Sequence, residues 1–361
     1  MKVLFFISDF KVGVTSLLAE QAIALSKVDR LNMYFIGGTN EQEPGLVDRL
    51  HQQHIKPILV DRLDEHCKLL AKAKVLKQVI SEIMPDYVHV QNNWQLLLVS
   101  LIKFFGRQPF KVIYTIHGYR HNYYFRSFLA RWLIMVELLL LSNTVIITSS
   151  FVKKKFPLVR FKSKIAFLGT DPAFFSKNDV PNIDPLAVNM VFAGQFRHGK
   201  NQDLLIQAFH NFVLTSGNKS FNLILPGEGP LKQHCVDLVN HLHLNDRVYF
   251  PGQLSRKEMV NLYFTSNIAV VPSNSETFGQ CISEPFVTGL CVISRRVGVA
   301  EDIIDHEKNG FLYSSAAELE NILLHLEHHP ELIAAAGRMA LKTRMKFSWD
   351  HIAHNFITIY G

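Results

Sequence analysis

Short apolar runs alternate with stretches of helical spacing along the first half of the chain. The apolar runs predict strands over residues 2–8, 31–37, 56–60, 87–90, 111–116 and 145–149. Between them, apolar positions at helical spacing predict helices over residues 17–27, 47–54 and 68–84. Strands that alternate with helices are typical of a doubly wound parallel sheet.

The second half repeats this alternation. Strands are predicted over residues 189–194, 220–225, 247–250, 268–271, 291–294 and 311–313, and helices over 201–214, 231–241 and 330–360, the last of them broken near 347–349. Three prolines interrupt the pattern between the halves, at Pro172, Pro181 and Pro185.

We therefore expect an α/β protein with two Rossmann-like doubly wound parallel-sheet domains that face a cleft. The first domain covers residues 1–170, a linker 171–188 and the second domain 189–340. A C-terminal helix over 341–361 is expected to cross back to the first domain.

Composition indicates a globular chain, because 48% of the 361 residues are hydrophobic and only 19% are charged. The four cysteines form no C-x-x-C pair, which favours reduced thiols in the cytoplasm. No apolar run approaches the ~20 residues of a spanning helix, and the first residues predict a strand rather than a signal peptide.

Charge is divided unevenly along the chain. Residues 1–170 hold 23 Lys and Arg against 12 Asp and Glu, a balance of +11, whereas the remainder holds 15 against 19, a balance of −4. A basic first half favours an anionic partner: a phosphorylated acceptor, an anionic membrane surface or nucleic acid. We expect a cytoplasmic protein that contacts the inner face of the cytoplasmic membrane peripherally.

The most informative stretch of the chain contains Glu276 and Glu284. An apolar strand over 268–271 leads into a loop of Pro, Ser and Asn, and Gly279 then begins a helix. Backbone N–H groups at such a helix start suit an anion such as a diphosphate. Carboxylates beside it are good acceptors for sugar hydroxyls.

Other candidate residues follow predicted strands of the second domain. Arg197 and Lys200 can place two cations over a diphosphate, although a solvated basic turn explains them equally well. Gly227 and Gly229 permit close backbone approach to a flat or phosphorylated ligand, and Gln253 lies in a turn that suits a base. Each of these three loops alone also fits an ordinary tight turn.

The order of these loops resembles that of the retaining GT-B glycosyltransferases called family four. The resemblance lies in the Gly194–Lys200 loop, the Pro226-Gly-Glu-Gly-Pro-Leu231 loop, Phe250-Pro-Gly252, the Pro272–Glu284 stretch, and Gly298…Glu301 with Asn309-Gly310. It implies the GT-B fold and transfer of a sugar from a nucleoside-diphosphate sugar.

The resemblance also implies residue roles. Glu284 is expected to hold the ribose and Glu276 the transferred sugar, with Lys200 and an arginine on the diphosphate. Loop contacts are expected from Phe278, Gly279 and Gln280, and His117 is expected to face the sugar from the first domain.

The chain departs from the family pattern at three positions. Gln195 replaces the family's arginine, so Arg197 is expected to supply that charge. Only Gly13 remains of the usual glycine pair after the first strand, and Pro285 follows Glu284, where a first helical turn accepts proline. His117 taken alone also fits a structural role.

We interpret the chain as a retaining hexosyltransferase of bacterial surface polysaccharide, including lipopolysaccharide, synthesis. Its expected donor is a UDP-sugar and its expected acceptor a glycan or polyprenyl-diphosphate-linked sugar. No cofactor or metal is expected, because the sequence has neither an Asp-x-Asp nor a His/Cys cluster with ligand spacing.

Two alternatives remain open at this point. A nucleotide-sugar epimerase uses the same scaffold without an acceptor, and a non-catalytic nucleotide-sugar-binding homologue fits the Gln195 departure. The aromatic and basic residues 114–131 favour a helix that packs in the first domain over an interfacial membrane patch or a nucleic-acid contact. No nucleic-acid partner is expected, because no recognised nucleic-acid-binding module accompanies them.

Overall fold

The computed structural model describes most of the 361-residue chain, namely residues 1–9, 14–28, 31–38, 46–53, 55–60, 69–117, 128–181, 187–217 and 220–360. It divides into two compact units. Unit 1 comprises Met1–Gly169 together with Trp349–Gly361, and unit 2 comprises Thr170–Ser348.

Unit 1 is built on one parallel sheet of seven strands. The order is β3-β2-β1-β4-β5-β6-β7. The strands are β1 (Lys2–Asp9), β2 (Asn32–Gly38), β3 (Lys56–Leu59), β4 (Tyr87–Val90), β5 (Lys111–Ile116), β6 (Thr144–Ile147) and β7 (Ser163–Ile165). The helices are α1 (Val14–Ser26), α2 (Leu46–Gln52), α3 (Leu69–Ile83), α4 (Asn93–Gly106), α5 (Phe128–Leu141), α6 (Ser150–Lys155), the 3-10 helix η1 (Pro157–Lys162) and α14 (Trp349–Tyr360).

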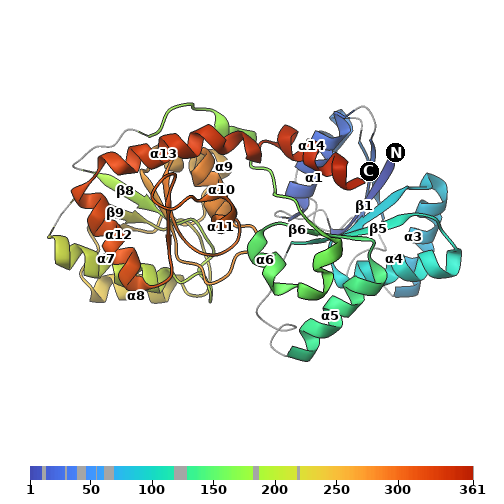
Figure 1. The fold of residues 1–361 in the computed structure, drawn as a ribbon, viewed down its shortest axis with the longest axis horizontal. Helices are drawn as coiled ribbons and strands as arrows, with labels where there is room; N and C mark the ends of the chain where they lie inside the picture. The colour runs from blue at the N-terminus through green and yellow to red at the C-terminus, as the bar shows by residue number, and fades with distance from the viewer. Residues whose placement is uncertain are drawn as a thin grey trace. The chain divides into compact units, whose positions relative to one another are not determined.

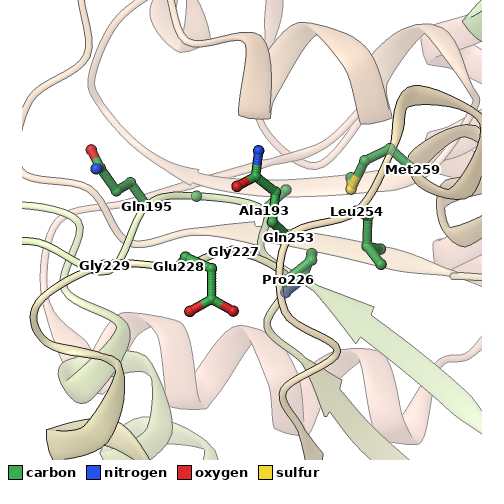
Figure 2. Close-up of a pocket in the computed structure, with 10 residues that line it drawn as sticks. Ala193, Gln195, Pro226, Gly227, Glu228, Gly229, Gln253, Leu254 and Met259 are labelled. Atoms are coloured by element: carbon green, nitrogen blue, oxygen red, sulfur yellow. The ribbon is translucent and has the colours of Figure 1, made fainter.

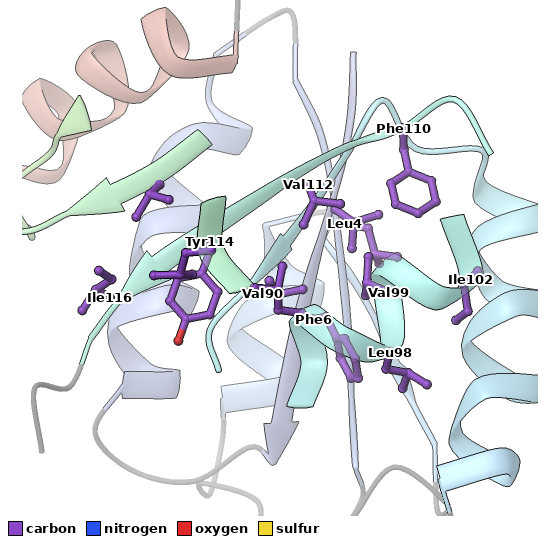
Figure 3. Close-up of a cluster of buried hydrophobic side chains, with 14 of the residues drawn as sticks. Leu4, Phe6, Val90, Leu98, Val99, Ile102, Phe110, Val112, Tyr114 and Ile116 are labelled. Carbon is purple, nitrogen blue, oxygen red and sulfur yellow. The ribbon is translucent and has the colours of Figure 1, made fainter. Parts of the chain in front are cut away.

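Alternate residues of β1, an interior strand of the sheet, pack into two separate cores in unit 1. Val3 and Phe5 pack with α1 and α14, whereas Leu4 and Phe6 pack with α3, α4 and α5. This alternation is the period-two geometry of a strand buried on both faces. Figure 1 shows α1 beside α14, and Figure 3 shows the second core, in which Phe6 lies near Val90 and Leu98.

Unit 2 is built on a parallel sheet of six strands in the order β10-β9-β8-β11-β12-β13. The strands are β8 (Val188–Val191), β9 (Phe221–Ile224), β10 (Val248–Tyr249), β11 (Ile268–Val271), β12 (Cys291–Arg295) and β13 (Phe311–Tyr313). The helices are η2 (Pro172–Phe175), α7 (Gln202–Ser216), α8 (Lys232–His241), α9 (Arg256–Phe264), α10 (Gln280–Val287), α11 (Ala300–Ile303), α12 (Ala316–His328), α13 (Glu331–Thr343) and η3 (Arg344–Phe347).

The predicted pair of doubly wound parallel sheets is confirmed. The predicted strands over 87–90, 111–116, 268–271 and 311–313 have the bounds that the structure gives them. Part of the expected linker, Pro172–Phe175, forms η2 in unit 2, where Phe174 is buried and its ring lies 5.7 Å from that of Tyr263.

The sequence did not predict α4. Its residues Leu96, Leu98, Val99 and Ile102 are buried, but the outward positions are apolar as well, so the segment has no polar face to reveal its period. Local chemistry still specifies the helix start, because the Asn92 side chain accepts a hydrogen bond from the backbone N–H of Gln95 at 3.0 Å.

The C-terminal helix α14 is anchored in unit 1 by Tyr360. This side chain is fully buried, its hydroxyl lies 3.0 Å from Nδ1 of His89, and its ring meets that of Tyr87 edge-on at 5.5 Å. Burial also lowers the pKa of His89 to about 3, so the imidazole is neutral. The last residues of α14 therefore complete the core of unit 1.

Tyr360→Ala is expected to lower the free energy of unfolding by about 3–5 kcal/mol, because it leaves a large cavity in a packed core. Tyr360→Phe keeps the ring and loses only the hydroxyl on His89, so its expected cost is about 1–3 kcal/mol. Urea unfolding followed by circular dichroism measures both. Equal costs for the two variants would show that the hydrogen bond, not the packing, anchors α14.

Candidate functional site

The carboxyl edge of the unit 2 sheet holds a point where the strand order reverses. From β8 the chain proceeds to β9 and β10 on one side, and then to β11, β12 and β13 on the other. In such sheets ligands bind outside the carboxyl ends of the strands beside the reversal. A ligand site is therefore expected at the loops that follow β8 and β11.

These two loops are joined by backbone and amide hydrogen bonds. The Asn201 side chain donates to the carbonyl of Pro272 at 2.8 Å, and the backbone N–H of Asn274 donates to the carbonyl of Gly199 at 2.9 Å. The Asn274 side chain also donates to Oδ1 of Asn201, at 3.3 Å. The connection fixes the residues that lie between the two loops.

Lys200 and Glu276 form an ion pair at this junction. Their Nζ and Oε1 atoms are 2.6 Å apart, and each side chain is only 12% exposed. The Cys281 thiol donates to the same Oε1 atom at 3.7 Å. Burial acts to lower the pKa of Lys200, but Cys281 and Glu276 outweigh it, and the pKa lies above its ordinary value. Lys200 is therefore a fixed cation.

Arg197 lies on the same loop and is exposed. Its carbonyl accepts the backbone N–H of Lys200 at 3.1 Å, so the two residues flank one turn. Its guanidinium is near enough to Lys200 to lower the pKa of that ammonium slightly through charge repulsion. Two cations from one loop thus lie at the carboxyl end of β8, as the sequence predicts.

A cavity of about 540 Å³ opens at the loop that follows β8. It is lined from the segments after β8, β9 and β10 and from α9, by Ala193, Gly194, Gln195, Pro226, Gly227, Glu228, Gly229, Gln253, Leu254 and Met259. Figure 2 shows the Gln253 amide and the Glu228 carboxylate pointing in opposite directions. The Glu228 carboxylate forms an ion pair with Lys232, with 2.7 Å between Oε1 and Nζ.

Gly227 and Gly229 shape this cavity by letting two backbones touch. Their φ angles are 139° and 153°. A Cβ atom on Gly227 would lie 2.2 Å from the carbonyl oxygen of Gly194, and one on Gly229 would lie 2.3 Å from that of Phe196. Only glycine permits this approach of the β9 loop to the β8 loop. The close approach predicted from the sequence is therefore between two loops of the protein itself.

Glu284 lies further along α10 in a charged, half-buried position. The Tyr263 hydroxyl donates to its Oε2 atom at 3.5 Å, and Asp171 and Arg256, which form an ion pair with one another, act on it electrostatically. Burial raises the pKa of Glu284 to about 7, although Arg256 opposes the shift. This carboxyl consequently changes charge near neutral pH.

The start of α10 connects Glu276 to Glu284. Gly279 is the N-cap of α10 and Gln280 its first residue. The Phe278 ring is buried at 6.3 Å from that of Phe347, and its carbonyl accepts the N–H of Val299 at 2.8 Å. Phe278 therefore holds the loop in place through its side chain.

Pro285 corrects one expectation from the sequence. It is the sixth residue of α10 and does not lie in the first turn. The helix continues for only two residues beyond it, to Val287, so the missing N–H removes one hydrogen bond near the end of a short helix.

His117 directly follows β5 in unit 1. Its Nε2 atom lies 2.7 Å from Oε1 of Gln91, and its Nδ1 atom is buried without a partner among the described residues. Burial lowers the pKa of His117 to about 4. Because Nε2 donates to the amide oxygen, Nδ1 is left as a hydrogen-bond acceptor. Gly13 lies outside the described residues.

The sequence missed the residues that surround Glu284. Tyr263 and Arg256 belong to α9, whose capping box of Ser255 and Glu258 is visible in the sequence and marks a helix start beside the Gln253 turn. Leu254 and Met259 of the cavity lining also belong to this segment. Among the described residues, no group of three or more His, Cys, Asp or Glu is arranged to hold a metal ion.

Two family models match the chain. Residues 13–166 match the model described as Glycosyltransferase Family 4, and residues 178–343 match the model described as Glycosyl transferases group 1. The first segment contains His117, and the second contains Lys200, Glu276 and Glu284.

Among curated proteins, a D-inositol 3-phosphate glycosyltransferase of Saccharomonospora viridis is 28% identical over 183 residues, which are 48% of this chain and 42% of that protein. The chain spans less than half the length of this and the other leading curated relatives that it matches.

Two solved structures share the fold over nearly the whole chain. Anabaena HepE in complex with UDP has a TM-score of 0.77 at 21% identity, with 99% of both chains covered. The apo form of the lipopolysaccharide outer core galactosyltransferase WaaB has a TM-score of 0.76 at 14% identity, also with 99% of both chains covered.

Proposed function

The chain belongs to the glycosyltransferases of group 1 and family 4, and on that premise we propose that it transfers a hexosyl group from a UDP-sugar to a hydroxyl of a glycan or of a polyprenyl-diphosphate-linked sugar. We propose further that the anomeric configuration is retained. The observation that carries the proposal is the Lys200–Glu276 pair at the strand reversal of unit 2, on loops of which the first, after β8, also lines the 540 Å³ cavity through Gly194 and Gln195.

Residues at the carboxyl edge of the unit 2 sheet suit each part of the proposed donor. The cavity between the β9 and β10 loops suits a planar base, and the cations Arg197 and Lys200 suit the diphosphate. Glu284 suits the paired hydroxyls of a ribose, and Glu276 those of the sugar. The choice of UDP is supported by the Anabaena neighbour, which was solved with UDP bound.

The proposed chemistry depends on charge rather than on a protein nucleophile. The bond between the sugar C1 and the diphosphate oxygen breaks, the acceptor oxygen bonds to C1 on the same face, and the departing phosphate takes the acceptor proton. Lys200, Arg197 and the first N–H groups of α10 stabilise the charge that develops on the leaving group. In this proposal no metal ion is required.

The acceptor is proposed to bind unit 1. Nδ1 of His117 can accept a hydrogen bond from a sugar hydroxyl. Residues 1–170 carry a charge balance of +11, which suits a phosphorylated lipid carrier and an anionic membrane surface. A role in surface polysaccharide synthesis is supported by the structural likeness to an enzyme of the lipopolysaccharide outer core.

A thermal-shift screen of nucleotide sugars tests the donor, because a ligand that binds the native state raises the midpoint of unfolding. The stabilising donor is then incubated without metal, with and without a lipid-linked acceptor, and the product is examined by NMR. The proposal requires a new α or β linkage of the same configuration as the donor. A new donor isomer in the absence of acceptor would identify an epimerase instead.

The affinity for UDP is expected to fall as the pH drops below about 7. Burial raises the pKa of Glu284 to about 7, so the carboxylate that accepts from the ribose hydroxyls is present above this pH and is progressively protonated below it. Because the ligand favours the ionised form, the affinity is full from about one pH unit above this pKa and declines as the pH falls through it.

Calorimetry of UDP binding across this pH range, for the wild type and for Glu284→Gln, measures the effect. The titration of UDP itself affects both proteins equally, so it cancels when the dissociation constant of Glu284→Gln is divided by that of the wild type. This ratio should be constant above about pH 8 and fall toward one in acid. A ratio that does not change with pH would exclude Glu284 from the ribose contact.

A further inference from the structure

Helix α4 presents an apolar stripe to solvent. Leu97 and Leu101 are 45% and 40% exposed, and Phe104 and Phe105 are 77% and 78% exposed. Their spacing places them on one side of the helix. The opposite side already fills the core of unit 1 with Leu96, Leu98, Val99 and Ile102, so the exposed stripe has no packing role in the described part of this unit.

The neighbouring elements α5 and η1 expose further apolar side chains. Leu133 and Leu140 of α5 are 62% and 73% exposed, and Phe161 of η1 is 78% exposed. The Lys162 ammonium joins η1 to the end of α5 by donating to the carbonyls of Leu139 and Ser142, both at 2.6 Å. We call the following seven residues the apolar surface: Leu97, Leu101, Phe104, Phe105, Leu133, Leu140 and Phe161.

The chain around the apolar surface is almost free of acidic residues. Between Asp86 and Asp171 it contains twelve Lys and Arg but a single carboxylate, Glu137. That carboxylate is half-buried and accepts a hydrogen bond from Asn93 at 2.6 Å. The exposed cations of this stretch include Arg107, Lys155 and Arg160.

We infer that the apolar surface inserts into the interfacial region of an anionic lipid bilayer. Exposed Phe and Leu side chains bordered by Lys and Arg are the composition of an interfacial membrane contact. The one-sided positive charge of this stretch is complementary to anionic lipid head groups, and this favours a bilayer over a protein partner. No helix among the described residues is long and apolar enough to span a bilayer.

The inference rests on the proposed function, because a lipid-linked acceptor is what would bring the enzyme to a membrane. It goes further by assigning the contact to α4, α5 and η1 and by requiring insertion of side chains in addition to attraction of charge. Binding to lipid is measurable without donor or acceptor, so it is tested separately from transfer.

The test compares two matched double variants of the full chain. Leu133→Ser/Leu140→Ser removes two leucines of the apolar surface, and Leu204→Ser/Leu214→Ser removes two leucines of α7 in unit 2 that are 53% and 69% exposed. Each protein is sedimented with vesicles of phosphatidylglycerol and phosphatidylcholine, with vesicles of phosphatidylcholine alone, and at rising salt.

The first variant is expected to partition into anionic vesicles at least about tenfold more weakly than the wild type, because each inserted leucine loses its transfer from water. The α7 variant should stay within about twofold of the wild type, and neutral lipid or high salt should weaken binding of all three proteins. Sedimentation velocity shows the oligomeric state of each.

Equal partitioning of the two double variants would overturn the inference. So would a self-associated wild type that becomes monomeric in the first variant and is indifferent to lipid, because the surface would then bind a second copy of the chain. If vesicle binding follows the apolar surface while no nucleotide sugar gives transfer, the membrane contact stands and the proposed function fails.

Discussion

Lys200→Met is expected to lower the turnover number by about 100-fold or more. Lys200 is 12% exposed, and its charge is fixed by Glu276 at 2.6 Å, at the junction of the loops that follow β8 and β11. In the proposed reaction this ammonium stabilises the charge that grows on the diphosphate as the sugar leaves. A pre-positioned cation in a partly dry site contributes more to the transition state than to binding of the donor, so the loss should fall mainly on turnover. Steady-state kinetics with the stabilising donor measures it.

The same substitution has a structural consequence that must be separated from the chemical one. Removing Lys200 leaves the carboxylate of Glu276 largely buried and without its cation, which costs about 3–5 kcal/mol of stability in comparable pairs. The double variant Lys200→Met/Glu276→Gln removes both charges and should recover most of this loss while remaining inactive. Recovered stability together with recovered transfer would show that the pair is structural. Lys200→Arg keeps the charge and should retain a measurable part of the activity.

The sequence predicts the fold wherever the pattern of polar and apolar positions distinguishes a strand or a helix from its surroundings. The strand over 268–271 is buried on both faces and bounded by polar residues, and its predicted limits are those in the structure. Helix α4 was not predicted, because Leu97 and Phe104 on its solvent-facing side are as apolar as the residues on its buried side. An exposed apolar side removes the contrast between polar and apolar positions on which the prediction depends.

The candidate site could be predicted in its residues but not in its contacts. Gly279 and Glu284 were expected near a helix start, and the structure places them at the N-cap and within α10. The pairing of Lys200 with Glu276 spans 76 residues, and only the order of the strands brings the two together. Burial is the main cause of the raised pKa of Glu284, and Arg256 and Asp171, which lie far from it in the sequence, shift that pKa in opposite directions.

Gly227→Ala is expected to weaken UDP binding by about tenfold or more and to destabilise unit 2. Gly227 has a φ of 139°, where side chains are rarely tolerated, and its added Cβ would lie 2.2 Å from the carbonyl oxygen of Gly194. The contact is with backbone on both sides, so no rotamer change relieves it and the β8 and β9 loops must separate. Those loops provide Gly194, Gln195 and Glu228 to the cavity, and their separation deforms the proposed base site.

Gly217→Ala is the matched control for this prediction. Gly217 also has a positive φ, 65°, at the C-cap of α7, but an added Cβ would meet no atom of the described residues within 4 Å. The control therefore carries the backbone cost of alanine in the left-handed region, about 1 kcal/mol, without the steric conflict. Calorimetry of UDP binding should find the control within about twofold of the wild type, and thermal unfolding should find Gly227→Ala the less stable of the two. If both variants bind UDP like the wild type, the approach of the β8 and β9 loops serves only packing, and the base must bind elsewhere.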